Sequence, residues 1–157
     1  MSSVAVAVHD ETGPSELADN EVDAERWQKL AIESLRTEGI VSGELNLVFV
    51  GSDQMAQLNQ QHMDGVGPTD VLAFPIDGLE LEDPGGDGVP AMLGDVVVCP
   101  TVAAANATVH EVEVDDEIAL LVVHGILHVL GHDHVDPAET ALMKRKEQEL
   151  LDRHHHP

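Results

Sequence analysis

Cysteine, aromatic rings and cations are all scarce in this chain of 157 residues. Its single cysteine, Cys99, excludes an internal disulfide and fits a reducing cytoplasm. No apolar run reaches membrane-spanning length, and the N-terminus lacks the basic and apolar regions of a signal peptide. We therefore expect a cytoplasmic protein that has no contact with membranes.

The shortage of cations bears on nucleic-acid binding. Thirty Asp and Glu against seven Lys and Arg give a formal net charge of −23, and no Lys or Arg lies between Thr37 and Met143. A nucleic-acid binder normally carries a basic surface, whereas this chain repels RNA at long range. An acidic surface also serves solubility where salt screens the repulsion. Contact with RNA would therefore depend on a metal, on histidines, on the two basic clusters (residues 26–36 and 144–153) or on a basic partner protein.

The aromatic residues are limited to Trp27, Phe49 and Phe74. All three fall at positions where we expect the hydrophobic core. The chain therefore lacks the stacking platform on which RRM and OB domains bind single-stranded bases.

The length predicts one domain, which we place at residues 1–153, followed by a His-rich tail at residues 154–157 that can bind metal weakly. Hydrophobic periodicity and turn residues predict a mixed order of elements. The expected strands are 4–8, 45–50, 69–76 and 93–99, and the expected helices are 22–37, 52–61, 100–109, 115–130 and 136–153. Ser52 or Asp53 should cap the second helix, and Asp115 and Asp116 the fourth. Residues 77–91 read as a flexible loop. Without regular alternation, this order predicts an α+β fold with one small sheet covered by helices.

The most informative stretch is residues 124–134, which read HGILHVLGHDH. His124 and His128 lie four residues apart in an apolar run, which places both rings on one face of a helix. Gly131 can take the left-handed conformation that ends a helix, so the chain can turn back and bring His134 beside the pair. Three neutral imidazoles with a fourth position open to water or substrate are typical of a catalytic zinc site. We therefore predict one Zn²⁺ bound by His124, His128 and His134.

The same spacing occurs in the metzincin proteases, which have His at the first, fifth and eleventh positions and Gly at the eighth. A metalloprotease needs Glu at the second position as its general base, and this chain has Gly125 there. The metal ligands are present and the peptidase base is missing. Another group, or the substrate itself, would have to accept the proton.

Three motifs resemble the YbeY endoribonucleases, bacterial zinc proteins linked to ribosomal RNA maturation and quality control of the small ribosomal subunit. Residues 124–134 match the family pattern HGxLHLxGYDH except that His132 replaces Tyr, residues 68–75 (PTDVLAFP) match PTDVLSFP, and residues 93–98 (LGDVVV) match LGD(I/L)VI. The resemblance implies a four-stranded mixed sheet whose central helix carries the His-x3-His metal motif. It also implies a single-strand-specific endoribonuclease acting in late 16S rRNA processing. Met63 stands where many members have an Arg inferred to face phosphate.

Other catalytic residues are less clearly marked. Asp133, His62 and Asp70 are weak candidates: Asp133 or Asp70 for orienting a ligand, and His62 for lining the cleft. Each also has a structural explanation, as a cap, a turn or a surface histidine. Two alternative functions remain open. One is a metal-dependent hydrolase of another substrate such as a peptide. The other is a non-catalytic ribosome-assembly factor that binds basic small-subunit ribosomal proteins through its acidic surface.

Overall fold

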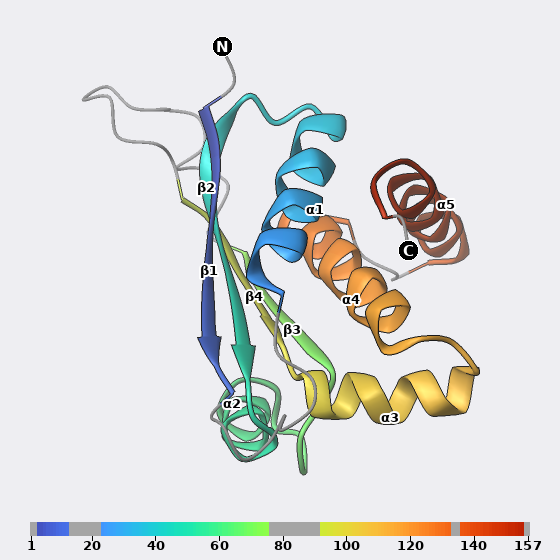
Figure 1. The fold of residues 1–157 in the computed structure, drawn as a ribbon. Helices are drawn as coiled ribbons and strands as arrows, with labels where there is room; N and C mark the ends of the chain where they lie inside the picture. Colours follow the sequence, from blue (N-terminus) through green and yellow to red (C-terminus); the bar gives the residue numbers. More distant parts are fainter. Residues whose placement is uncertain (1–2, 13–22, 76–91, 133–135, 156–157) are drawn as a thin grey trace.

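A computed structural model describes residues 3–12, 23–75, 92–132 and 136–155. Figure 1 shows a sheet with helices packed mainly against one of its faces. The elements, in chain order, are β1 (Ser3–Glu11), α1 (Ala24–Thr37), β2 (Ser42–Val50), α2 (Ser52–Met63), β3 (Val71–Pro75), β4 (Met92–Val98), α3 (Pro100–His110), α4 (Val114–Val129) and α5 (Pro137–His154). The α+β prediction is confirmed. The predicted loop at residues 77–91 lies outside the described residues.

The sheet has the order β1-β2-β4-β3. β1 pairs with β2 and β2 with β4 in parallel, whereas β3 runs antiparallel to β4 and forms one edge. The mixed four-stranded sheet implied by the resemblance is therefore confirmed. Gly94 in β4 has a φ of 150°, and a Cβ there would lie 2.5 Å from the Phe74 carbonyl oxygen, so only glycine lets β3 come this close.

Successive side chains of a strand point to opposite faces of the sheet, so the hydrophobic residues of the sheet form two cores. The larger core includes Leu45, Leu47 and Phe49 of β2 and packs against α1 and α4. The smaller core, on the opposite face, includes Val50 of β2 and Met55 of α2. The prediction that Phe49 and Trp27 lie in the core is confirmed, while Phe74 is partly buried beside the smaller core.

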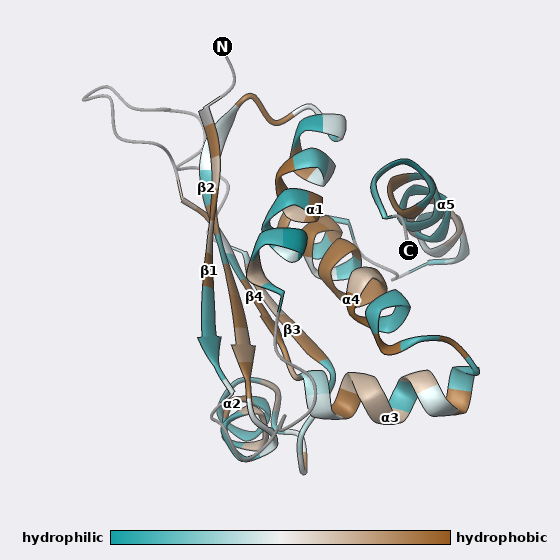
Figure 2. Cartoon of the chain, viewed as in Figure 1, coloured by the Kyte–Doolittle hydropathy of each residue, from teal (hydrophilic) through white to brown (hydrophobic). Residues whose placement is uncertain are grey.

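Helix α4 is central, because it contacts β3, β4, α1, α3 and α5. Figure 2 shows it hydrophobic over most of its surface, whereas α5, which packs on α1 and α4, is largely hydrophilic. Ten of the sixteen residues of α4 are buried. Each fully buried Leu or Ile stabilises the fold by about 1.5–3 kcal/mol. The histidines on α4 therefore project from a helix held in place by the core.

Two predicted helix caps are wrong. Gly51, not Ser52 or Asp53, is the N-cap of α2, and Glu113, not Asp115 or Asp116, is the N-cap of α4; neither makes a side-chain capping bond. Asp136 caps α5, near the start predicted for the last helix, by accepting a hydrogen bond from the Glu139 backbone N–H at 2.8 Å. None of the helices in the described part of the chain is long and apolar enough to cross a membrane.

Candidate metal centre

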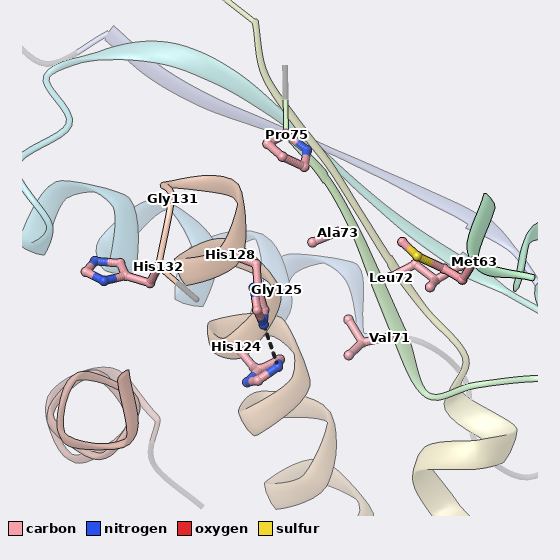
Figure 3. A pocket seen from close by; sticks show the side chains of 10 residues that line it. All are labelled: Met63, Val71, Leu72, Ala73, Pro75, His124, Gly125, His128, Gly131 and His132. Atoms are coloured by element: carbon pink, nitrogen blue, oxygen red, sulfur yellow. Dashed lines mark hydrogen bonds between the residues drawn. The ribbon is translucent and has the colours of Figure 1, made fainter. Parts of the chain in front are cut away.

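His124 and His128 lie on α4 one turn apart, and their rings face each other (Figure 3). The two Nε2 atoms are 3.1 Å apart, and the ring planes make an angle of 72°. Two imidazole nitrogens bound to one tetrahedral zinc, each at about 2.0–2.1 Å, lie about 3.3 Å apart. The observed spacing therefore fits two ligands of a single metal ion without any rearrangement of the helix.

Glu147 on α5 binds the other side of the His124 ring. Its Oε2 lies 2.5 Å from His124 Nδ1, and its side chain is only 13% exposed. An ionised carboxylate can only accept a hydrogen bond, so Nδ1 must carry the proton. In the neutral ring this leaves the lone pair on Nε2, the atom that faces His128, which is the tautomer that binds metal. No sequence pattern marks this residue, because Glu147 is one of several acids in a charged helix and contacts His124 only when α5 packs on α4.

A cavity of about 410 Å³ opens beside the two histidines. Figure 3 shows β3 along one side of it and α4 along the other. Its apolar side includes Val71 and Ala73 of edge strand β3 and Met63 at the end of α2. Met63 is 53% exposed. Residue 63 therefore lines the same cavity as the histidine pair, but as Met it carries no charge.

Gly125 explains why the peptidase base is missing. A Cβ at this position would lie 2.5 Å from Cγ1 of Val96 on β4 and 3.4 Å from Cγ2 of Val71 on β3. Real Cβ atoms essentially never approach another heavy atom that closely. Helix α4 can therefore pack this tightly on the sheet only with glycine at residue 125, and a Glu would force the two apart.

The chain turns where predicted. Gly131 has a φ of 100°, and the His132 backbone N–H donates to the Leu127 carbonyl oxygen at 2.9 Å. His134 and Asp133 lie just beyond, outside the described residues. No cluster of three or more His, Cys, Asp or Glu suited to a metal ion is found in residues 3–12, 23–75, 92–132 and 136–155. The third ligand therefore stays a prediction.

His132 is half-buried, and it lines the same cavity as the pair but lies apart from the facing rings (Figure 3). Its Nε2 is 3.6 Å from Glu38 Oε1, and Lys146 Nζ is 3.0 Å from the same oxygen. His132 thus belongs to a polar contact between the end of α1, the end of α4 and α5.

Asp70 and His62 make other contacts. The Asp70 carboxylate accepts hydrogen bonds from the Val71 backbone N–H at 2.8 Å and from Asn106 Nδ2 at 3.1 Å, which tie the start of β3 to α3. The His62 ring packs edge-on against Phe74, with ring centroids 5.0 Å apart. Neither residue lines the cavity with the histidine pair.

The first two histidines of the predicted tail contact the rest of the domain. His154 ends α5 and lies 2.7 Å from Thr37 Oγ1. His155 lies 2.8 Å from Asp116 Oδ1, and its ring stacks on Trp27 with centroids 6.3 Å apart. The hydrogen bond from His155 is the main reason why the pKa of Asp116 lies below its usual value.

Comparison with known proteins adds a family to this geometry. A family model described as Endoribonuclease YbeY matches residues 11–155. The chain belongs to the YbeY family. A relative from Thermobifida fusca, called Endoribonuclease YbeY, is 44% identical over 132 residues, which cover 82% of this chain and 84% of the relative. A relative of the same name from Salinispora tropica is 41% identical over 137 residues, covering 83% and 87%.

A solved structure shares the fold of this chain. A protein from Thermotoga maritima, determined in solution, superposes with a TM-score of 0.59 at 25% identity, covering 94% of this chain and 90% of the other. The resemblance stated from the three motifs is thus confirmed, and it extends over nearly the whole domain.

Proposed function

We propose that this chain is a zinc-dependent endoribonuclease that cleaves single-stranded RNA during late 16S rRNA processing and quality control of the small subunit, in the cytoplasm. The observation that carries the proposal is the pair of Nε2 atoms, 3.1 Å apart, beside an open cavity. Family relatives named Endoribonuclease YbeY support the reaction class. The proposed substrate is ribosomal RNA, and basic small-subunit ribosomal proteins are proposed partners.

In this proposal His124, His128 and His134 hold one zinc and leave one coordination position to water or substrate. When bound, the metal would polarise a phosphoryl oxygen and lower the pKa of a coordinated water. Glu147 holds the His124 ring and its proton in place. The apolar wall of β3 and Met63 bounds the space in which the ribose and base lie.

The attacking group is either water or the 2′-hydroxyl of the substrate. The two routes leave different ends, because attack by the 2′-hydroxyl produces a 2′,3′-cyclic phosphate and water attack does not. Analysis of the ends, together with a substrate carrying a single 2′-deoxy sugar at the cleavage position, separates the routes without any assumption about the proton acceptor.

Peptide hydrolysis is disfavoured by the packing at Gly125, where a Glu would collide with Val96. The non-catalytic alternative, an assembly factor for basic ribosomal proteins, is favoured by the net charge of −23. It predicts salt-sensitive binding to such proteins and no cleavage of RNA.

The test is cleavage of a defined RNA, single-stranded and duplex, by chelated and zinc-reloaded protein. His128→Ala is the site variant, and His110→Ala is a matched control, because His110 lies at the end of α3 and does not line the cavity. We expect cleavage of the single strand by reloaded wild type and by the control only. Equal cleavage by chelated protein or by His128→Ala would refute the proposal, and RNA left intact by reloaded wild type would favour the assembly factor.

A further inference from the structure

A second cavity lies on the other side of His124. It measures about 410 Å³ and is lined by His124 of α4 and by Thr140, Met143, Lys144 and Glu147 of α5. His124 lines both this cavity and the one along β3, so its ring stands between them. Figure 3 shows α5, the helix seen end-on, across the His124 ring from β3. An RNA strand that passes over the histidine pair would therefore extend from the cavity along β3 into the cavity between α4 and α5.

Lys144 brings a cation to this cavity, which also holds the carboxylate of Glu147. Residues 140, 144 and 147 share one face of α5, because they are spaced four and three apart. Four of the seven Lys and Arg lie within 4 Å of a carboxylate, namely Arg26, Arg36, Lys146 and Arg153. No such pair is found in the described ranges for Lys29, Lys144 or Arg145, and of these three only Lys144 lines a cavity beside the histidines.

The polar neighbours of Lys144 are already engaged. Thr140 Oγ1 donates to the Asp136 carbonyl oxygen at 3.0 Å. Glu147 accepts from His124 Nδ1 at 2.5 Å. Lys144 is therefore the group in this cavity with donors to offer an anion. The other cavity, along β3, is lined by Met63 and by no Lys or Arg of the described residues.

We propose that the cavity between α4 and α5 is a phosphate subsite, in which Lys144 Nζ binds a backbone phosphate next to the one cleaved at the histidine pair. The proposal rests on the endoribonuclease function and adds the direction of the strand: ribose and base lie along β3, and the neighbouring phosphate lies against α5. In this proposal Lys144 on α5 supplies a cation for the substrate that Met63 on α2 cannot supply.

The test measures binding of a single-stranded 2′-O-methyl oligonucleotide to zinc-loaded protein over a salt series. The modification blocks attack by the 2′-hydroxyl, and electrophoresis after each titration checks that the oligonucleotide has not been cleaved by water. Lys144→Gln should lower affinity at low salt about fivefold or more and reduce the slope of log K against log salt by about 0.7, the value for one single-strand phosphate contact. Lys144→Arg should keep both. Arg145→Gln is the matched control, because it removes a neighbouring charge that does not line the cavity, and its slope should match wild type.

An unchanged slope in Lys144→Gln, or an equal loss in Arg145→Gln, would overturn the subsite. Cleavage kinetics separate this from failure of the function itself. Lys144→Gln should raise KM with kcat little changed, because a remote phosphate contact binds ground state and transition state alike. If Lys144→Gln and wild type have the same KM and kcat for zinc-dependent cleavage, the subsite is refuted and the endoribonuclease function stands. If wild type does not cleave RNA, the function is refuted, and the salt slope of binding alone decides whether Lys144 binds phosphate.

Discussion

Replacing Glu147 tests how the site prepares His124 for a metal. Its carboxylate lies 2.5 Å from Nδ1 and is 13% exposed, so water competes little for this hydrogen bond. Glu147→Ala removes the acceptor and lets the ring exchange tautomers and rotate. Glu147→Gln keeps an acceptor oxygen but removes the charge that raises the basicity of Nε2.

The size of the effect follows from measured losses at comparable contacts. Mutation of a carboxylate that orients a metal-bound histidine typically costs 10- to 100-fold in metal affinity, which is about 1.4–2.7 kcal/mol. We expect Glu147→Ala near the upper end, because it removes both orientation and charge. Glu147→Gln should lie near the lower end, because it removes the charge alone.

The assay is zinc affinity by competition with a chromophoric chelator, with ¹⁵N NMR of the His124 ring in metal-free protein as a second readout. Glu149→Gln is the matched control, because Glu149 lies on the same helix, is 55% exposed and pairs with Arg153 instead. Wild-type zinc affinity in Glu147→Ala, or equal losses in Glu149→Gln, would refute the reasoning. Protonated Nδ1 in wild type and a mixture of tautomers in Glu147→Ala would support it.

Three further predictions concern packing, charge and pH. Gly125→Ala should lower the free energy of unfolding in urea by about 1–3 kcal/mol, because its Cβ would lie 2.5 Å from Val96 Cγ1. The double variant with Val96→Ala should lose less stability than the two single variants added together, and strictly additive losses would contradict the clash. Met63→Arg should strengthen RNA binding by about 1.5–3 kcal/mol if it reaches a phosphate, and wild-type activity should fall only shallowly, or rise, with salt; steep salt inhibition of wild type with no gain from the Arg would show that another surface binds RNA. The pKa of Asp116 lies below 3.8, chiefly through its hydrogen bond from His155, so the contact stabilises the fold above pH 3.8 and this contribution is lost as the pH falls through the lower, folded pKa. His155→Ala should raise the pKa toward 3.8 in an NMR titration, and an unchanged pKa would show that His155 is not the cause.

Periodicity was enough to predict most of the elements, since strands and helices with one buried face keep their pattern in the sequence. Helix starts were predicted less well. The start of the last helix was predicted well because Pro137 favours the first helical position. Asp115 and Asp116 instead lie within the first turn of α4, where an acid also stabilises the helix dipole. Composition alone does not distinguish these positions.

The histidine pair was predictable because both histidines lie on one helix at a spacing fixed by its geometry. Glu147 and Lys144 were not, because they join the site only through the packing of α5 on α4. The order of the strands was likewise not readable from local pattern, since β2 pairs with β4 across a long stretch of chain. The four-stranded mixed sheet came from the family resemblance.

Zinc content per chain tests the central claim most directly. The terminal histidines should be replaced by Gln rather than deleted, because His154 and His155 contact Thr37 and Asp116. Native mass spectrometry of this chain should show one zinc, and adding His128→Ala should abolish it. Loss of zinc on replacing the tail, with zinc retained in a His128→Ala variant that keeps the tail, would contradict the account.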